Sequence, residues 1–480
     1  MNSLRLLIAA ALCQTLTIGA AGQDQFGPPV AISNNATWTW AVGSADLDGD
    51  GDQDVLATNN STGQVLWFEN TGHHFTSWPE RIISNSCPNS FLVKTGDIDG
   101  DGDIDVLAGA NALGQVHWYE NVNSASQWTK HIISFGVPSV QGLEIVDIDL
   151  DGDMDVLAVS WAQGRVAWLE QVSPNQWIDK TISSGITRAN LVDAADMDGD
   201  GDIDVLSASE TLGQFYWFEN DRSFGENWTS HIIASNCNFP RWIQAADING
   251  DGHMDALTGE ENGNEVAWHK NDGGSFPVFT KHTITQNAEL VMEVAAEDLD
   301  LDGDLDVLAA SREDDKVAWH ENSGGANPTW TEHLIDANVD WASTVHAADL
   351  TGNGWPDVLS GSWGAGQVSW YANQAAPVLS IELVDSGRAK MALRNATGPM
   401  VYFLGSRHGE GPTYLPGQDL SLDLSRPIHT LSCTAPDSFG IAILSKEVPP
   451  YLQGRAVWVQ CLDGDPGAMV KSNLIEWTFN

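Results

Sequence analysis

Basic residues are scarce in this chain of 480 residues, which holds 21 Lys and Arg against 66 Asp and Glu and has a formal net charge of −45. A surface of this sign repels the phosphates of nucleic acids and the headgroups of anionic lipids. The repulsion persists even if each acidic loop described below binds a divalent cation, because the ions neutralise only part of the charge. Nucleic acid and anionic membranes are therefore excluded as partners.

Long apolar runs are absent after the N-terminal segment, so we expect no membrane insertion of the mature chain. The N-terminus itself, MNSLRLLIAAALCQTLTIGAAGQ, combines Arg5, an apolar run and small residues that end at Ala21. These features predict a secretory signal peptide over residues 1–21. Cys13 does not indicate a lipoprotein, because Leu12 precedes it where a small residue is required. We expect a secreted protein or one held at the cell surface by other means than a membrane helix.

Cysteine is sparse, and removal of the signal peptide leaves four cysteines in an oxidising compartment. Cys433 and Cys461 share the C-terminal region and are predicted to form a disulfide. Cys87 and Cys237 occupy similar loop positions three repeats apart, nearly opposite each other in a seven-part ring. We do not expect these two to pair, since their bond would have to cross the centre of the ring.

Helical periodicity is absent as well. Instead, an acidic loop that leads into an apolar strand recurs seven times at intervals of 49 to 51 residues. The clearest copies are DLDGDGDQDVLA at 46–57 and DIDGDGDIDVLA at 97–108. Each repeat holds four strand-like segments separated by Gly, Asn and Asp. One small sheet cannot bury both faces, whereas a ring of such sheets can. The sequence therefore predicts an all-β protein in which residues 24–373 form a seven-bladed β-propeller.

Two further registers of the repeat hold the same residue type in most copies. The third strand-like segment carries a tryptophan, and the fourth segment carries a histidine in four copies. Strict repetition in mid-strand indicates packing between blades rather than ligand platforms or a metal cluster. The residues are Trp67, Trp118, Trp168, Trp217, Trp268, Trp319 and Trp370, and His131, His231, His282 and His333.

The phase of the repeat predicts how the ring closes. No fourth segment follows Asn373 in the last repeat, whereas a segment without a repeat, FGPPVAISN, stands at 26–34 before the first acidic loop. We predict that this N-terminal strand completes blade seven and removes an exposed sheet edge.

The acidic loop has the composition of a calcium site. In the first copy, positions one, three, five and nine are Asp46, Asp48, Asp50 and Asp54, position six is glycine, and position seven, Asp52, offers its backbone carbonyl. Alternate carboxylates on a tight turn converge on one point, and oxygen-only ligands select a hard cation such as Ca²⁺. An EF-hand is rejected, because it needs a Glu at position twelve and flanking helices.

We predict about five to seven Ca²⁺ ions, mainly structural, and no catalytic residues. The predicted metal ligands of loops one to four and six are Asp46, Asp48, Asp50, Asp52 and Asp54; Asp97, Asp99, Asp101, Asp103 and Asp105; Asp147, Asp149, Asp151, Asp153 and Asp155; Asp196, Asp198, Asp200, Asp202 and Asp204; and Asp298, Asp300, Asp302, Asp304 and Asp306. Those of loop five are Asp247, Asn249, Asp251, His253 and Asp255, and those of loop seven are Asp349 and Asp357.

Loops five and seven depart from the pattern. Loop five replaces one carboxylate by Asn249, and loop seven holds Thr351 and Asn353 in place of the middle acids. Because ligand charge tunes affinity, site seven is predicted to be the weakest. A turn that binds no metal explains loop seven equally well.

The loop D-x-D-G-D-G-D-x-D-V-L, followed by a V-x-W-[FY]-E-N strand, resembles the FG-GAP or VCBS repeat of integrin-α-type β-propellers, and the likeness covers residues 24–373. In that family the loop joins the first and second strands of each blade and holds a mostly structural Ca²⁺. The FG and GAP tripeptides are largely missing, so the resemblance is to the bacterial VCBS branch. Loop seven departs from the family pattern and loop five departs mildly.

In a four-stranded antiparallel meander the acidic loops occupy one face of the ring and variable loops the other. The variable loops carry aromatic residues that do not repeat, of which Trp161, Trp242, Trp341 and Trp363 are the predicted ligand residues; Trp38, Trp40 and Phe91 accompany them. The nearby polar residues are Glu210, Glu260, Glu261, Arg188 and Arg241. Such a surface suits a sugar. Packing of wide loops over the centre of the ring is the alternative.

After Pro377 the repeat stops, and seven strand-like segments separated by Gly and Pro predict a β-sandwich module over residues 377–480. This region resembles the C-terminal β-module of many secreted bacterial repeat proteins. Asp463 and Asp465 form only a turn, since no further acids follow at the loop spacing.

The sequence favours a monomeric calcium-binding propeller that acts as a binding or adhesion scaffold for a glycan or an extracellular protein. The alternative is a propeller-fold polysaccharide lyase or glycosidase with its site on the variable-loop face. No HExxH, GxSxG or Asp-box motif occurs, and we expect no enzyme activity. A purely structural surface protein is a third possibility, and fold alone does not choose among them.

Overall fold

The computed structural model describes residues 25–72, 78–173, 175–221 and 228–373, together with the backbone of strands in the C-terminal region. The predicted signal peptide lies outside the described residues. The chain divides into two units, of which the larger spans 27–350 and 356–372. In the described part, no helix is long and apolar enough to cross a membrane.

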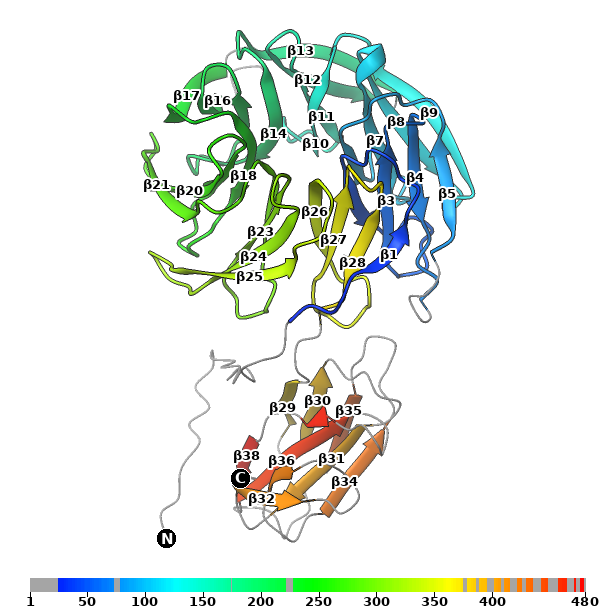
Figure 1. Cartoon of the computed structure of the whole chain (residues 1–480), viewed down its shortest axis with the longest axis vertical. Helices are drawn as coiled ribbons and strands as arrows, with labels where there is room; N and C mark the ends of the chain where they lie inside the picture. Colours follow the sequence, from blue (N-terminus) through cyan, green and yellow to red (C-terminus); the bar gives the residue numbers. More distant parts are fainter. Residues whose placement is uncertain are drawn as a thin grey trace. The chain divides into compact units, whose positions relative to one another are not determined.

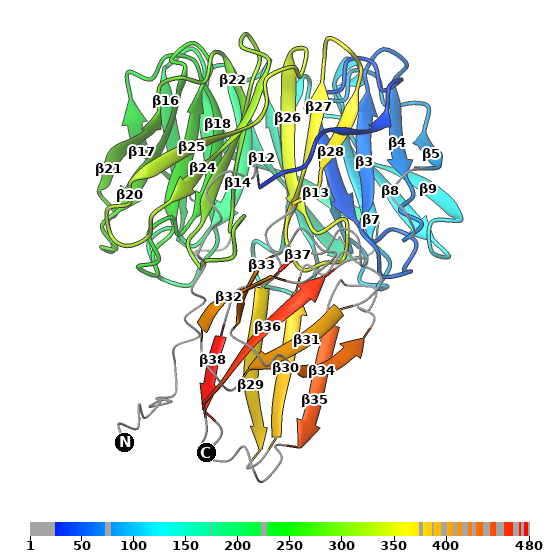
Figure 2. The same ribbon diagram turned by 60° about the horizontal axis from the view of Figure 1, so that its bottom comes forward.

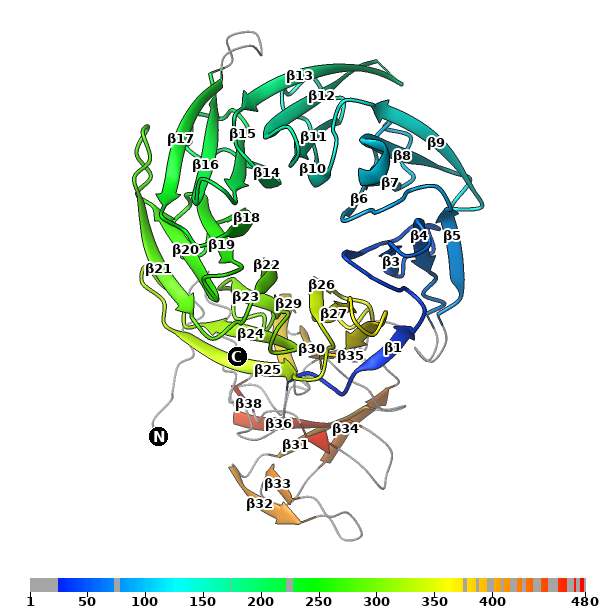
Figure 3. The same ribbon diagram turned by 45° about the horizontal axis from the view of Figure 1, so that its top comes forward.

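The larger unit is a ring of seven antiparallel four-stranded sheets, as predicted (Figure 1, Figure 3). Blade one holds β2 (Val42–Ala45), β3 (Asp54–Asn59), β4 (Gln64–Phe68) and β5 (Glu80–Ser84). Blade two holds β6 (Val93–Gly96), β7 (Asp105–Ala110), β8 (Gln115–Val122) and β9 (Gln127–Ser134), with the 3-10 turn η1 (Asn111–Leu113) after β7. Blade three holds β10 (Val140–Val146), β11 (Asp155–Ser160), β12 (Arg165–Ser173) and β13 (Gln176–Ser184). Blade four holds β14 (Ala189–Ala195), β15 (Asp204–Ser209), β16 (Gln214–Asn220) and β17 (Trp228–Ser235).

The remaining blades have the same order. Blade five holds β18 (Pro240–Ala246), β19 (Asp255–Glu260), β20 (Glu265–Asn271) and β21 (Phe279–Thr285). Blade six holds β22 (Val291–Glu297), β23 (Asp306–Ser311), β24 (Lys316–Asn322) and β25 (Trp330–Asp336). Blade seven holds β26 (Ala342–Ala348), β27 (Asp357–Ser362), β28 (Val368–Tyr371) and, as its outermost strand, β1 (Val30–Ser33).

The N-terminal strand closes the ring, as the phase of the repeat predicted. β1 runs antiparallel to β28, with Val30 opposite Trp370 and Ala31 opposite Ser369. The N–H of Gly27 also donates to the carbonyl of Ala372 at 2.8 Å. Residues from both ends of the repeat array therefore share one sheet, and blade seven has its full set of four strands.

The repeated tryptophans lie in the core between blades. The second strand of every blade is buried at all six positions, and it pairs with the third strand that carries the tryptophan. All seven tryptophans are at most 4% exposed. Large aromatic side chains between flat sheets bury much apolar area, which stabilises each blade against the next. The packing interpretation is thus confirmed.

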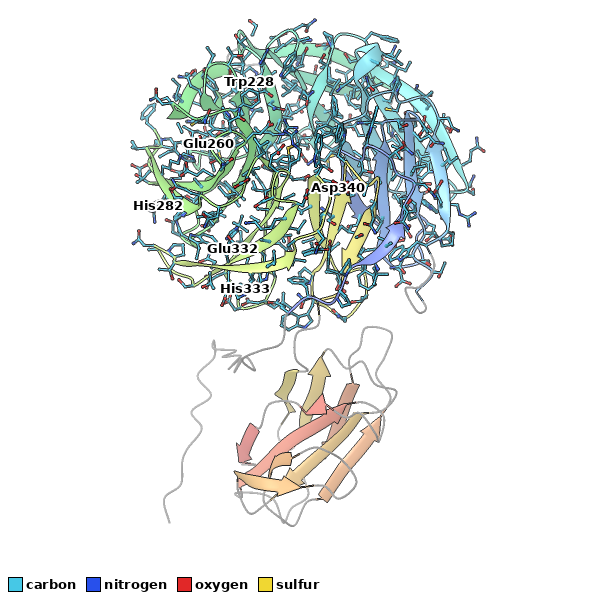
Figure 4. All side chains as sticks on the ribbon, viewed as in Figure 1. Trp228, Glu260, His282, Glu332, His333 and Asp340 are labelled. Atoms are coloured by element: carbon cyan, nitrogen blue, oxygen red, sulfur yellow. The ribbon has the colours of Figure 1, made fainter. Side chains whose placement is uncertain are left out.

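The repeated histidines stack on these tryptophans at the outer edge of the ring. His333 lies on Trp319 with ring centroids 4.5 Å apart, and its Nε2 contacts Glu321 Oε2 at 2.7 Å. His131 and His231 make the same pair of contacts in their own blades. Figure 4 shows His282 and His333 on successive outer strands at the periphery. Each histidine serves its own blade, and the four do not gather at one point.

The connections alternate between two faces of the ring (Figure 2). Each acidic loop joins the first strand of a blade to the second, so all seven lie on one face. The turns from the second to the third strand and the links between blades lie on the other face. We call this second surface the variable-loop face.

The C-terminal unit contains the seven predicted strand segments and three further strands. One sheet has the order β29 (Val378–Asp385), β30 (Arg388–Arg394), β35 (Ala442–Glu447). The hairpin of β32 (Glu410–Tyr414) and β33 (Ser421–Leu424) forms a separate two-stranded sheet. The other sheet has the order β34 (His429–Thr434), β31 (Val401–Ser406), β36 (Ala456–Asp463), β37 (Val470–Lys471), with β38 (Ile475–Thr478) also on β36. The side chains of Cys433 and Cys461 lie outside the described residues, so their disulfide stays a prediction.

Candidate functional site

Five of the acidic loops bring carboxylates together. In loops one, two, three and six, the aspartates at positions one, three and five each place an oxygen within 4.8 Å of the others, as Asp46, Asp48 and Asp50 do. In loop four the cluster is Asp196, Asp198 and Asp204. Three converging carboxylates without nitrogen or sulfur donors form the ligand set that Ca²⁺ prefers. These are the five loops that keep every acid of the sequence pattern.

Backbone hydrogen bonds hold the loop in this shape. In loop one the N–H of Gly51 donates to Asp46 Oδ2 at 3.0 Å, and the N–H groups of Asp50 and Asp52 donate to Asp48 and Asp50. Gly51 has a φ of +96°, a conformation that a residue with a Cβ rarely adopts. The carboxylates therefore converge because the turn is fixed, and the side chain at position seven stays out of the cluster.

The carboxylate at position three is affected by burial and by the carboxylate at position five of the same loop. Burial, and next the charge of Asp50, raise the pKa of Asp48 above its ordinary value. In loop six the same two causes, burial and the neighbouring Asp302, raise the pKa of Asp300 to about 6. A bound divalent cation would offset this repulsion, since it favours the charged form of each ligand.

The aspartate at position nine also links the acidic loop to the third strand of its blade by hydrogen bonds. Asp54 is fully buried, and its oxygens accept N–H groups from Leu47 in the loop and Asn70 at the end of β4, at 3.1 and 2.7 Å. Burial raises the pKa of Asp54 to about 7. Each carboxylate oxygen has a second lone pair, so these bonds leave room for a metal ligand. The backbone contact to the third strand recurs in loops one to six.

Loop five contains a built-in cation. Lys270 Nζ lies 3.1 Å from Asp251 Oδ2, the carboxylate at position five. Although burial opposes it, the hydrogen bond from Lys270 lowers the pKa of Asp251. Lys270 stands at the end of β20, where the matching residue is Glu in blades one to four and six. Asn249, moreover, donates to Asp255 at 3.3 Å instead of offering a carboxylate.

Loop seven lacks a carboxylate cluster among the described residues. Asp349 and Asp357 bracket the loop, but Asn353 accepts the N–H of Trp355 at 2.8 Å, and Trp355 is buried. Thr351 and Asn353 stand where other loops have aspartates, so loop seven has too few carboxylates to form such a cluster.

An asparagine that sequence reasoning did not single out joins neighbouring acidic loops. Asn121, at the end of the W-Y-E-N segment of β8, donates to the carbonyl of Ile104 in its own loop at 3.0 Å. It also donates to the carbonyl of Leu47 in the loop of blade one at 2.7 Å. Asn70, Asn271 and Asn322 bridge to the preceding blade in the same way. The recurrence of this Asn was visible in the sequence, but its partner was not.

The variable-loop face has a shallow pocket on the axis of the ring, with a volume of about 30 Å³. Every blade contributes the residue that stands six places before the first aspartate of its acidic loop. These residues are Trp40, Phe91, Gln141, Asn190, Arg241, Met292 and Ser343. Trp242 and Glu293 complete the wall on the side of blades five and six. Of the predicted ligand residues, Trp242 therefore lines this pocket.

The other predicted tryptophans surround the pocket. Trp341 and Trp363 are stacked with centroids 4.6 Å apart, and Trp38 stacks on Trp363 at 5.9 Å. Trp40 contacts both Trp363, at 6.0 Å, and Phe91, at 5.2 Å. Several of these aromatic residues therefore pack on one another, as the alternative interpretation of loop packing expects. Trp38 and Trp341 nevertheless remain 52% and 39% exposed.

Arginines and glutamates alternate with these rings. Arg241 Nη1 lies 3.0 Å from Glu261 Oε2, and its guanidinium lies 5.6 Å from the Trp40 ring of blade one. Arg312 reaches the same Glu261 at 3.5 Å and lies over Trp341 at 5.5 Å. Arg312 also lies 3.8 Å from Glu313 Oε1, so each of these two arginines pairs with a carboxylate.

On the opposite side of the pocket, Trp161 donates its indole N–H to Glu210 at 3.1 Å, and Arg188 lies over the Trp161 ring at 4.9 Å. Glu260 is nearly buried and pairs with Lys281 at 2.9 Å, so it belongs to blade five rather than to the ligand surface. Gln141, Asn190 and Glu293 were missed by the sequence analysis. Each stands five or six residues before its acidic loop. The sequence shows this spacing, but only the closed ring shows that the residues at these positions meet on the axis.

Cys87 is buried and unpaired, and Cys237 is half-buried and unpaired. Burial raises the pKa of both thiols, to about 12 for Cys237. They are therefore weak nucleophiles at neutral pH.

Seven four-stranded blades with one acidic loop apiece define a seven-bladed β-propeller of the repeat type. The chain belongs to the FG-GAP-like repeat family, whose model matches residues 46–108, 97–158, 147–207, 196–258, 247–309 and 298–360. Each match spans two successive acidic loops.

Solved structures show the same fold at low identity. The crystal structure of BBS1N in complex with ARL6DN, soaked with lead, has a TM-score of 0.51 and 11% identity, with coverage of 73% of this chain and 98% of that chain. The mercury-soaked form gives a TM-score of 0.52 at 10% identity, with the same coverage. Among curated proteins, none matches the chain.

Proposed function

We propose that the protein is an exported, calcium-stabilised propeller that acts as a binding or adhesion scaffold and takes a glycan on its variable-loop face. The observation that supports the proposal is the group of aromatic and polar side chains that surrounds the shallow axial pocket, among which Trp38 and Trp341 are 52% and 39% exposed. Sugars present apolar ring faces and many hydroxyls, and a site of this composition matches both.

The ligand test compares single substitutions on a glycan array. Trp40→Ala is expected to abolish or strongly weaken binding, because the indole forms one wall of the pocket. Phe276→Ala is the matched control, since Phe276 is 79% exposed on the face that carries the acidic loops. Absence of binding by the wild type, or equal binding by both variants, removes the glycan proposal. Degradation of a bound oligosaccharide would favour the lyase or glycosidase alternative.

The calcium part has its own test. Removal of Ca²⁺ with a chelator is expected to lower the midpoint of thermal unfolding, because the carboxylate clusters lose the cation that offsets their repulsion. Added Ca²⁺ should restore the midpoint, and Mg²⁺ should not, since Mg²⁺ demands a stricter octahedral geometry and dehydrates reluctantly. An unchanged midpoint after chelation contradicts a structural role for the ion.

A protein ligand is the second candidate. The similar structures are of BBS1N in complex with ARL6DN, so this fold occurs in a complex between two proteins. For the exported location, the test is the N-terminal sequence of the mature protein recovered from the culture medium or cell surface. A chain that retains residues 1–21 in the cytoplasm contradicts export.

A further inference from the structure

Blade six differs from the other blades at one position of its outermost strand. At the position opposite the first buried residue of the third strand, the other six blades hold a small, uncharged residue, whereas blade six holds Asp336 opposite Val317. The six small residues are Ser33, Ser84, Ser134, Ser183, Ala234 and Thr285. Because the blades otherwise pack in the same way, blade packing does not explain the charge of Asp336.

Asp336 lines a pocket between blades six and seven that has a volume of about 230 Å³. This volume has room for about eight water molecules, at roughly 30 Å³ for each in the liquid. Pro29 and Asn338 in the pocket wall are exposed. Ser360, Ser369 and Tyr371 are at most 5% exposed, so the pocket extends from the surface into the space between the two blades.

Hydrogen bonds hold the carboxylate of Asp336 in place. The hydroxyl of Tyr371 donates to Asp336 Oδ2 at 3.0 Å and lies 3.2 Å from Ser360 Oγ. The N–H of Asn338 donates to Asp336 Oδ1 at 2.9 Å. Burial, with the charge of Asp336 adding to it, raises the pKa of Tyr371, so the phenol stays protonated at neutral pH. These neutral donors position the carboxylate and leave its negative charge unbalanced.

Two further polar side chains of the pocket lack a hydrogen-bond partner in the described part of the chain. They are the hydroxyl of Ser369, which is 5% exposed, and the amide of the half-buried Gln367. A buried hydroxyl without a partner costs free energy unless water or a ligand meets it. The pocket therefore presents a fixed carboxylate together with a hydroxyl and an amide that can each donate and accept.

We propose that this pocket binds a small organic cation, a primary amine that also carries hydroxyl groups. The ammonium group donates to Asp336, and the hydroxyl groups of the ligand bond to Ser369 and Gln367. None of the described residues that line the pocket is basic, so no side chain there competes for the carboxylate.

Other classes of ligand fit the pocket less well. An anion is repelled by Asp336 and by the net charge of −45. A metal ion alone needs more carboxylate ligands than the single one that this pocket offers. The inference does not rest on glycan binding, because this pocket and the axial pocket share no lining residue.

The test is isothermal titration calorimetry of the full chain at neutral pH with ethanolamine and glucosamine, beside their uncharged counterparts ethylene glycol and glucose. The amines are expected to bind and the counterparts are not. Asp336→Asn keeps the shape of the side chain and is expected to weaken amine binding by about tenfold or more, because a charge-assisted hydrogen bond is lost. Asp340→Asn is the control, since Asp340 is exposed and lies outside the pocket lining; it should change affinity by less than about twofold.

A second variant fills the pocket without a change of charge. Leu66 in blade one pairs with Ala57 as Ser369 in blade seven pairs with Ser360, so the repeat accepts leucine at this position. Ser369→Leu is expected to abolish amine binding and to leave the midpoint of thermal unfolding in the absence of ligand no lower than that of the wild type.

Each result decides the matter. Equal binding of the amines and their uncharged counterparts overturns the proposal, and so does amine binding that survives either Asp336→Asn or Ser369→Leu. Absence of amine binding by the wild type overturns it as well and leaves the glycan proposal intact.

Discussion

Single residues adapt one copy of the repeat without changing the fold. The register after the core tryptophan holds Phe68 and Phe218 in blades one and four, but His320 in blade six. His320 is only 2% exposed, and burial, with Lys316 and His333 adding to it, lowers its pKa to about 4. The imidazole is therefore neutral in the folded protein at pH 7 and occupies the place of a phenyl ring.

The first prediction follows from that pKa. Between pH 6.5 and 4 the unfolded chain binds a proton at His320 that the folded chain does not, so acidification lowers the free energy of unfolding by up to about 1.4 kcal/mol per pH unit. His320→Phe removes this loss and fits the register. The stability of the variant relative to the wild type, measured by urea denaturation, should rise as the pH falls through this window. Parallel pH profiles of the two proteins contradict the assignment.

A second prediction concerns loop five, where Asn249 and Lys270 replace two acids together. The lysine ammonium lies 3.1 Å from Asp251 and supplies a positive charge where a metal ion would otherwise supply it. The double change Asn249→Asp with Lys270→Glu restores the pattern of the other loops and is expected to add one bound Ca²⁺ per chain, counted by isothermal titration. Lys270→Glu alone is the control, because it leaves position three without a carboxylate. An unchanged count in the double variant contradicts the substitution of metal by lysine.

At the scale of elements, the asparagine at the end of the third strand connects the acidic loops of neighbouring blades, which strand pairing does not connect. Asn121 is almost fully buried, and its amide bonds two carbonyls that belong to acidic loops of adjacent blades. Equivalent amide-to-carbonyl bonds join six pairs of neighbouring acidic loops.

Asn121→Ala should therefore destabilise the propeller by roughly 1–3 kcal/mol, because two buried carbonyls lose their donor. Chemical denaturation measures the change. Asn262→Ala, at an exposed turn of blade five, serves as the control and should be nearly neutral. Equal effects of the two changes would show that the bridging bonds do not stabilise the ring.

For the whole molecule, ring closure depends on one short strand from the N-terminus. β1 supplies the outermost strand of blade seven, and Ile32 on it is buried. Because the first and last blades are far apart in sequence, their contact depends on a non-local strand pair.

Deletion of residues 1–34 is expected to lower the midpoint of thermal unfolding and to expose blade seven to limited proteolysis, since β28 becomes an unpaired edge. Deletion of residues 1–24 keeps β1 and is the control. A closed, equally stable ring after the longer deletion would mean that β1 contributes nothing to closure.

Much of the fold could be predicted because the period is written into the chain seven times. The number of blades, the N-terminal strand that completes blade seven and the core tryptophans follow from residue spacing, because every copy of the repeat packs in the same way. The candidate ligand surface was predictable only in part: Trp242 lines the axial pocket, whereas Trp341 and Trp363 stack on each other beside it. Gln141 and Glu293 could not be found, because residues with a different identity in each repeat carry no repeat signal.

The sequence by itself determined the all-β ring, the acidic loops that can chelate a cation, and the two loops that depart from them, because these depend on local residue order and strict repetition. Only the tertiary structure decided which residues of seven distant blades meet on the axis, that Lys270 reaches Asp251, and that Asn121 joins two loops. Those contacts arise between segments about 15 to 300 residues apart, and their distances follow from ring closure and strand register, which no local pattern encodes.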